Sequence, residues 1–194
     1  PTGMYDVALR VWEGAWQAGW QSTTGLLPIE TDLPLLNDDM VIVASFPILD
    51  NKTQSTIQSS YHFSSGIELI GYDVPKSAKA GEQIEFDFTW KVGRDISEDY
   101  IHFVHLFHDE TEYFTIFDRV PFDNRFPTSG WRAGWTFMDS FSLHLPEDMP
   151  TGQYTLRTGL YRASDAERDH ITDADGNPVV DWSIPLSAIN LDAE

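Results

Sequence analysis

Hydrophobic and polar residues alternate with a period of two along most of the chain, and no segment carries the longer period of a capped amphipathic helix. The clearest alternation lies in 82–90, where four apolar residues share one face: Ile84, Phe86, Phe88 and Trp90. The opposite face of this segment is polar. The pattern therefore predicts a strand with one side in a core and the other in water.

Other segments repeat this alternation. We expect strands over 137–145, with Phe141, Leu143 and Leu145 inward, and over 154–161, with Tyr154, Leu156 and Leu160 inward. Segment 100–108 is apolar on both faces, which is typical of a central strand covered on both sides. Three further strands are expected over 67–73, 112–118 and 179–191.

About seven short strands without crossover helices predict an all-β fold, an antiparallel immunoglobulin-like or fibronectin-like β-sandwich. The turn from Leu145 to Tyr154 contains Pro and Gly and leads into a strand at the tyrosine. This arrangement is typical of a tyrosine corner, in which the phenol hydroxyl bonds back to the loop backbone.

The beginning of the chain resembles a segment near its end. Pro-Thr-Gly-x-Tyr followed by alternating apolar residues occurs at 1–12 and again at 150–161. A chance match is one explanation, because this motif commonly leads into a strand. The alternative is a repeat.

If the repeat is real, residues 1–50 are the C-terminal part of a preceding similar β domain, or extra strands that pack on the sandwich. The polar, Ser-rich segment 51–66 is then a linker, and 67–194 form the β-sandwich domain. In this interpretation the strands over 5–12 and 40–48 lack their own partners. Their open edges would suit assembly by strand addition.

Composition excludes several classes of function. The chain has 31 acidic and 12 basic residues among 194, a net charge of -19, which excludes nucleic acid as a partner. It contains no cysteine, so it forms neither a disulfide nor a thiolate metal site. No run approaches the roughly 20 apolar residues of a membrane-spanning helix.

From Glu68 onward the chain resembles a family of extracytoplasmic β-sandwich domains at the C-terminal ends of bacterial multi-span, mannosyltransferase-like glycosyltransferases and in related surface proteins. The segments that carry this resemblance are Leu69–Asp73, Ala80–Glu82, Phe103–Leu106, Phe126–Arg132, Pro150–Tyr154, Gly159–Tyr161 and Thr172–Gly176. The resemblance implies a β-sandwich at the cell surface or in a secreted protein. It implies no catalysis, since the transferase chemistry of such proteins belongs to their membrane portions.

Two aromatic clusters are candidate glycan-binding sites, because sugars lay their apolar faces on aromatic rings. The first contains Trp12, Trp16 and Trp20, spaced by four residues. The alternative for these rings is burial against a neighbouring domain. The second cluster is Trp131, Arg132 and Trp135, for which a packed loop is the alternative.

A candidate calcium site lies in the turn with Asp173, Asp175, Asn177 and Asp181, whose oxygens suit a hard cation. The alternative is an ordinary turn, because Asp-Gly and Asn-Pro form turns without a metal. On a strand, His102 and His108 share one face while His105 lies on the other, so the three are expected to be structural.

No catalytic residue is predicted. The sequence favours a non-catalytic, acidic, extracytoplasmic β-sandwich module that binds glycans, or that serves as a spacer by binding neighbouring copies of itself. It requires no cofactor, with calcium as the one candidate ion. The alternative is a carbohydrate-active enzyme or an accessory domain of a membrane glycosyltransferase, which would show paired carboxylates in a cleft.

Overall fold

The structure, a computed structural model, describes residues 3–10, 12–13, 25–26, 35–37, 40–48 and 55–193. Side chains are described for 55–193 apart from Asp123 and Phe141. The chain divides into two compact units, Gly3–Ile48 and a larger unit that contains Leu49–Glu194. Each unit is described by itself.

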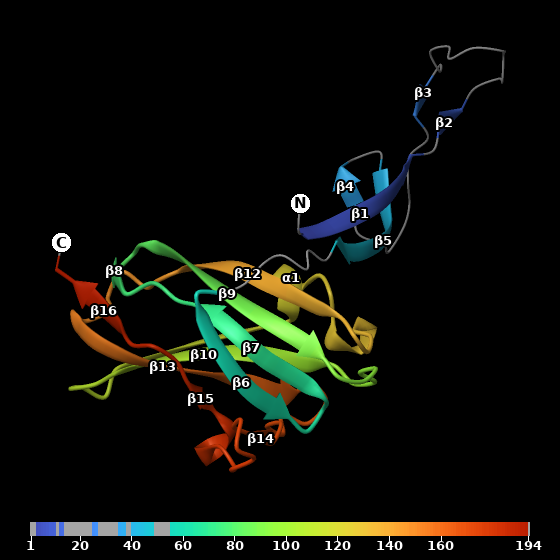
Figure 1. Cartoon of the computed structure of the whole chain (residues 1–194). Coiled ribbons are helices and arrows are strands. Elements are labelled where there is room, and N and C mark those ends of the chain that lie inside the picture. The colour runs from blue at the N-terminus through green and yellow to red at the C-terminus, as the bar shows by residue number, and fades with distance from the viewer. Residues whose placement is uncertain are drawn as a thin grey trace. The chain divides into compact units, whose positions relative to one another are not determined.

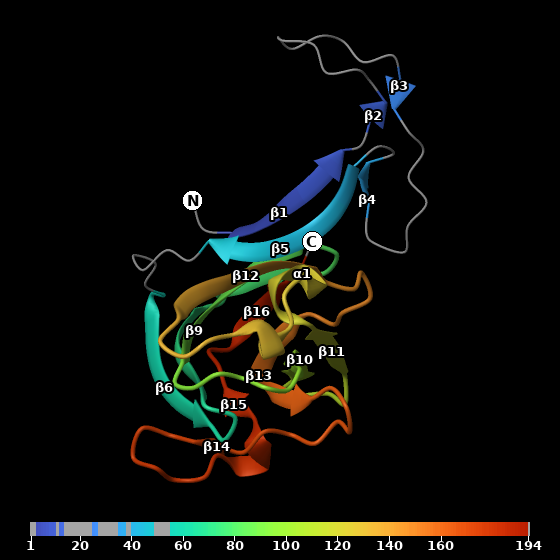
Figure 2. The same cartoon turned by 90° about the vertical axis from the view of Figure 1, so that its right-hand side faces the viewer.

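The larger unit is a β-sandwich whose two sheets face each other (Figure 1 and Figure 2). One sheet has the order β12-β9-β7-β6-β14, formed by β6 (Ile57–Phe63), β7 (Ile67–Asp73), β9 (Gln83–Val92), β12 (Thr136–His144) and β14 (Ile171–Thr172). The other has the order β11-β10-β13-β16-β8, formed by β8 (Ser77–Lys79), β10 (Tyr100–His108), β11 (Phe114–Arg119), β13 (Gly152–Arg162) and β16 (Ile189–Asp192). β15 (Ile184–Pro185) also pairs with β13.

Short helical turns connect some strands: α1 (Pro121–Asn124) and two 3-10 turns, Thr128–Gly130 and Val180–Trp182. Neighbouring strands of the sandwich run antiparallel except β16 and β8, which run parallel. The predicted all-β sandwich is therefore confirmed. The immunoglobulin-like subtype stays a prediction.

The core lies between the sheets, where the predicted inward faces meet. The inward residues of β9 and β13 are buried as predicted: Ile84, Phe86, Phe88, Trp90, Tyr154, Leu156 and Leu160. β10 differs from its prediction, because its outward face is covered at Phe103 but exposed at Phe107. On β12, Leu143 is half-buried, Phe141 lies outside the described side chains, and Leu145 is buried just after the strand.

Two strand predictions were wrong. β6 lies within the segment assigned to the linker, and it pairs with β7. Exposed and half-buried residues alternate along β6 up to the buried Phe63, so Gln58, Ser60 and His62 meet water on one side. The single strand expected over 179–191 is interrupted, because Asp181 and Trp182 have φ values of 54° and 48°. This left-handed backbone turns the chain before β15.

The predicted tyrosine corner is present. Tyr154 is fully buried, and its hydroxyl donates to the carbonyl of Pro150 at 2.8 Å. Burial, with a contribution from Tyr113, raises the pKa of Tyr154 to about 12. The neutral phenol is thus the form that the folded state favours.

We expect Tyr154→Phe to lower the free energy of unfolding by about 1 kcal/mol at pH 7, because it removes one buried hydrogen bond. A raised pKa means that the stability contribution of the phenol is complete below its ordinary pKa of 10 and is lost as the pH rises toward about 12. The variant should therefore lose less stability than the parent between pH 10 and 12. Urea unfolding of the parent and the variant at pH 10 and at pH 12 measures this difference. Equal losses of stability in the two proteins would contradict the assignment of the raised pKa to Tyr154.

In the smaller unit, β1 (Gly3–Arg10), β5 (Met40–Ile48) and β4 (Leu35–Asn37) form a sheet in the order β1-β5-β4. β2 (Trp12–Glu13) pairs with β3 (Gly25–Leu26). The expectation that the strands over 5–12 and 40–48 lack partners was wrong, because β1 and β5 pair with each other.

The strand pairing of the two units is similar. β1 begins at the glycine of the first Pro-Thr-Gly motif and pairs antiparallel with the last strand of its unit, β5. β13 begins at the glycine of the second motif and pairs antiparallel with β16. That residues 1–50 are a partial copy of the larger domain stays a prediction.

Polar groups connect the two sheets inside the core. Arg119 of β11 forms an ion pair and hydrogen bond with the fully buried Asp139 of β12, which also accepts from the backbone N–H of Phe122 at 3.0 Å. The His102 ring makes T-shaped contacts with Phe88 and Trp90 of the opposite sheet. Burial, with a contribution from Arg119, lowers the pKa of His102 well below its ordinary value.

Candidate ligand-binding face

The outer surface of β10, β11 and β13 has a regular arrangement of side chains that follows from the strand register. One cross-strand row contains Thr155, Phe107 and Phe114, and the next contains Arg157, His105 and Ile116. A third row contains Gly159, Phe103 and Asp118. Directly opposed side chains lie about 5 Å apart, so residues of adjacent rows form one continuous surface.

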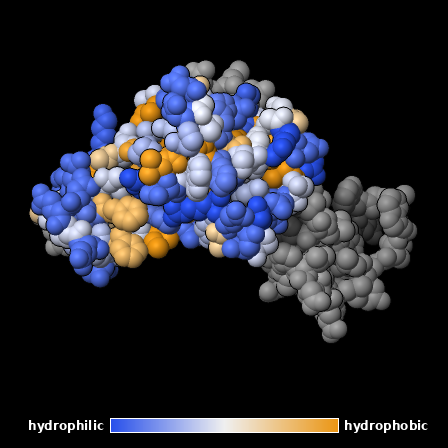
Figure 3. Space-filling view, turned by 90° about the horizontal axis from the view of Figure 1, so that it is seen from below, coloured by the Kyte–Doolittle hydropathy of each residue, from blue (hydrophilic) through white to orange (hydrophobic). Residues whose placement is uncertain are grey.

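Three residues of this surface form an exposed apolar cluster: Phe107, Phe114 and Ile116, with 38%, 56% and 49% of their surface accessible. The Phe107 and Phe114 rings stack with centroids 6.2 Å apart and an interplanar angle of 22°. Seen from below, hydrophobic side chains gather toward one end of the visible surface among hydrophilic ones (Figure 3). Grouped exposed apolar side chains are typical of binding surfaces.

A polar triad of His105, Asp118 and Tyr161 lies beside the apolar cluster. His105 Nε2 lies 3.3 Å from Asp118 Oδ1, and the Tyr161 hydroxyl donates to Asp118 Oδ2 at 3.0 Å. The ionised carboxylate only accepts, so the imidazole nitrogen is the donor. Burial raises the pKa of Tyr161, and the hydrogen bond to Asp118 raises it further.

The His105 ring is held between aromatic neighbours. Its centroid lies 4.6 Å from that of Phe103 and 6.2 Å from that of Phe107. Burial lowers the pKa of His105; its hydrogen bond to Asp118 opposes this, and the charge of Arg168 adds to it. The face thus combines a rigid apolar surface with oriented polar groups.

The predicted cluster of Trp131, Arg132 and Trp135 is a packed loop. Trp131 is fully buried against Trp90 and Phe137, so it offers no ring face to a ligand, and its prediction as a binding residue was wrong in this respect. The Arg132 guanidinium donates to the carbonyls of Ser129 and Trp131. Trp135 is half-buried and stacks on Phe126.

The other predicted aromatic row is untested. The backbone of Trp12 lies in β2, but its side chain is outside the described residues, as are Trp16 and Trp20. These three positions stay a prediction.

The predicted calcium turn is organised by hydrogen bonds. Asp173 Oδ1 accepts from the backbone N–H groups of Asp175 and Asn177 at 2.9 Å, and the Asn177 amide donates to the same carboxylate. These hydrogen bonds lower the pKa of Asp173, and those from Asn177 contribute most. Asp181 belongs to the 3-10 turn Val180–Trp182. Among the described residues, no group of three or more acidic or histidine side chains has the arrangement of a metal site.

The three histidines of β10 lie as their spacing predicts. His102 and His108 are buried on the inward face, and His105 is on the outward face. His102 Nε2 lies 2.8 Å from the Thr158 hydroxyl, which donates to the Phe103 carbonyl. His102 and His108 are structural, whereas His105 belongs to the candidate face.

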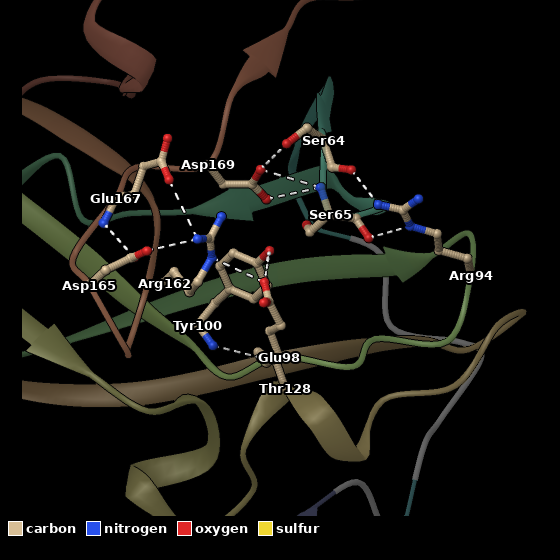
Figure 4. Close-up of polar contacts among 10 residues, drawn as sticks. All are labelled: Ser64, Ser65, Arg94, Glu98, Tyr100, Thr128, Arg162, Asp165, Glu167 and Asp169. Atoms are coloured by element: carbon tan, nitrogen blue, oxygen red, sulfur yellow. Dashed lines mark hydrogen bonds and ion pairs between the residues drawn. The ribbon is translucent and has the colours of Figure 1, made fainter.

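A second polar region lies where several loops meet at one end of the sandwich (Figure 4). The Asp169 carboxylate accepts from Ser64 and from the backbone of Ser65, and Arg94 donates to the carbonyls of both serines. Arg162 pairs with Glu98, Asp165 and Glu167. A pocket of about 290 Å³ adjoins this network. Arg162 is paired with carboxylates, and Asp169 and Arg94 are bonded to Ser64 and Ser65, so the network is best explained as a structural connection between loops.

Sequence reasoning missed the candidate face. Phe114 and Ile116 lie two residues apart on a predicted strand, with Asp118 next on the same side. That spacing identifies one face of β11 but not whether the face is inward or outward. Only the register with β10, whose other face lies against the opposite sheet, places it outside.

The described part of the chain contains no helix with the length and apolar character that crossing a membrane requires. No protein-family model and no curated protein matches the chain.

Solved structures show distant likenesses. The C-terminal domain of Wzt matches with 15% identity and a TM-score of 0.43, over 73% of this chain and 83% of that one. Spo0M, a sporulation control protein from Bacillus subtilis, matches with 15% identity and a TM-score of 0.35, over 70% of this chain and 50% of that one. A β-glucosidase from Listeria innocua in complex with glucose matches with 14% identity and a TM-score of 0.31, over 68% of this chain and 16% of that one. These likenesses are too distant to inform on function.

Proposed function

We propose that this chain is a non-catalytic β-sandwich module that binds glycans on the extracytoplasmic side of a bacterial cell envelope. The observation that carries the proposal is the exposed apolar cluster of Phe107, Phe114 and Ile116 beside the polar triad. Sugar rings present an apolar C–H face and a rim of hydroxyls. The cluster suits the first, and the triad suits the second.

Binding suits this face better than catalysis. The Asp118 carboxylate accepts from both His105 and Tyr161, so its oxygens hold these two side chains in place, as a binding surface requires. The family resemblance supports the extracytoplasmic location and an attachment to a membrane glycosyltransferase of the mannosyltransferase-like type. The module would then hold a glycan near an enzyme that acts elsewhere.

We expect Phe114→Ala to weaken glycan binding about tenfold, because the loss of one stacking ring costs about 1.4 kcal/mol. A glycan array first identifies a ligand, and isothermal titration calorimetry then measures its dissociation constant with each variant. Phe114 is more than half exposed, so the substitution should leave the fold intact.

Trp135→Ala provides the matched comparison, because it removes a half-buried aromatic ring from the loop that the sequence predicted as a site. We expect unchanged affinity for this variant. Loss of binding with Trp135→Ala but not with Phe114→Ala would place the site in the loop and contradict the proposed face. If no glycan on the array binds to the chain, glycan binding itself is contradicted.

A further inference from the structure

Two arginines border the candidate face. Arg157 lies in the same cross-strand row as His105 and Ile116. The Arg168 guanidinium lies over the Phe103 ring, 4.9 Å from its centroid. Among the described side chains, neither arginine forms an ion pair with a carboxylate, whereas Arg119 and Arg162 do. Arg94 and Arg132 also donate to backbone carbonyls, so what distinguishes Arg157 and Arg168 is their position beside the candidate face.

Each guanidinium is held in place by a neutral oxygen. Arg157 Nη1 donates to the Ser183 hydroxyl at 3.3 Å, and Arg168 Nη1 donates to the Asp181 carbonyl at 2.9 Å. A guanidinium has five N–H donors, so both retain donors beyond these bonds. Arg168 is exposed and Arg157 half-buried, which leaves them accessible to a ligand on the face.

The charge of Arg168 lies close to His105 and its aromatic neighbours. Phe103 lies beneath Arg168 and next to His105, with 4.6 Å between the Phe103 and His105 ring centroids. The charge of Arg168 also contributes to the lowered pKa of His105. The one carboxylate of the polar triad, Asp118, accepts from His105 and Tyr161. The two arginines thus lie beside an area that also holds the carboxylates of Asp118 and of Asp109, the latter bonded to the Thr155 hydroxyl at 2.7 Å.

We infer that the glycan bound by this face is acidic and that its sugar carboxylates pair with Arg157 and Arg168, which border the apolar cluster. This inference rests on the proposed function and names the class of its ligand. The planar guanidinium matches a carboxylate with two parallel hydrogen bonds. The net charge of -19 opposes any polyanion, and screening at physiological ionic strength confines this repulsion to about 8 Å, so a preference for an acid has to come from these direct contacts. The contacting arginines therefore decide the preference.

The test uses two probes with the same sugar skeleton, a hexamer of α-1,4-linked galacturonic acid and its fully methyl-esterified form. Calorimetry with the whole chain should give an affinity at least tenfold higher for the acid. Arg157→Gln should reduce that preference at least threefold, because it should lower the affinity for the acid more than the affinity for the ester. The control Lys79→Gln makes the same change in net charge on β8, at the opposite edge of the sheet, and should keep the preference.

Each result bears on the inference. Equal binding of both hexamers, or a preference that Lys79→Gln reduces as much as Arg157→Gln does, would overturn the carboxylate assignment while glycan binding stands. If neither hexamer binds, the ligands found on the glycan array are used instead. Carboxylated ligands whose affinity falls with Arg157→Gln support the inference. If all ligands on the array are neutral or sulfated, the inference is overturned. If no glycan on the array binds, the proposed function itself is contradicted.

Discussion

Replacing Asp139 by Ala is expected to lower the free energy of unfolding by about 3–5 kcal/mol, the usual cost of breaking a buried ion pair. The Asp139 side chain is fully buried and that of Arg119 is 11% exposed, so water cannot replace the lost carboxylate. The backbone N–H of Phe122 also loses its acceptor. Equilibrium unfolding in guanidinium chloride measures the change.

Two further variants make this expectation specific. The double variant Arg119→Met with Asp139→Leu should recover much of the lost stability, because it removes both charges from the core. Glu68→Ala breaks the exposed pair with Lys91 and should cost less than about 1 kcal/mol. A loss from Asp139→Ala as small as that from Glu68→Ala would show that the two sheets do not depend on this connection.

Trp90→Ala is expected to cost about 3–5 kcal/mol, the range for truncating a buried aromatic residue. The Trp90 ring is fully buried at the centre of the sandwich. Its centroid lies 5.2 Å from that of His102 and 6.3 Å from that of Trp131, so the substitution opens a cavity between strands and loop. The same unfolding measurement checks it.

A graded series separates cavity formation from other effects. Trp90→Phe keeps most of the ring and should cost clearly less than Trp90→Ala. Trp182→Ala removes a half-buried indole that stacks on His170 with 4.3 Å between centroids, and it should also cost less. If all three variants were equally stable, the Trp90 site would not be the centre of the core.

The fold was predictable where one side of a strand meets water. In β9 the polar residues Glu85 and Asp87 alternate with buried aromatic ones, so the period is clear in the sequence. β6 was missed because its half-buried positions include a serine and carry no continuous apolar pattern. Asp139 was equally unpredictable, since a carboxylate on an inward position is stable only because Arg119 reaches it from the other sheet.

The candidate site was less predictable than the fold. Exposed tryptophans are common in glycan sites, yet Trp131 is buried by Phe137 and by Trp90, and Trp90 is distant in the chain. The exposure of Phe114 depends on which face of β11 points away from the opposite sheet, and this is a tertiary property. Spacing alone correctly separated His105 from His102 and His108, because alternation along a strand is local.

The sheet that carries the candidate face also has a mechanical polarity. β16 has a neighbour on each side, antiparallel β13 and parallel β8, so a pull along β16 loads two ladders of hydrogen bonds in shear at once. β11 is bonded only to β10 and lies at the far edge of that sheet. Tension entering through β16 therefore spreads into the middle of the sheet before it reaches Phe114 and Ile116. A pull along β16 therefore loads the edge that carries the candidate face last.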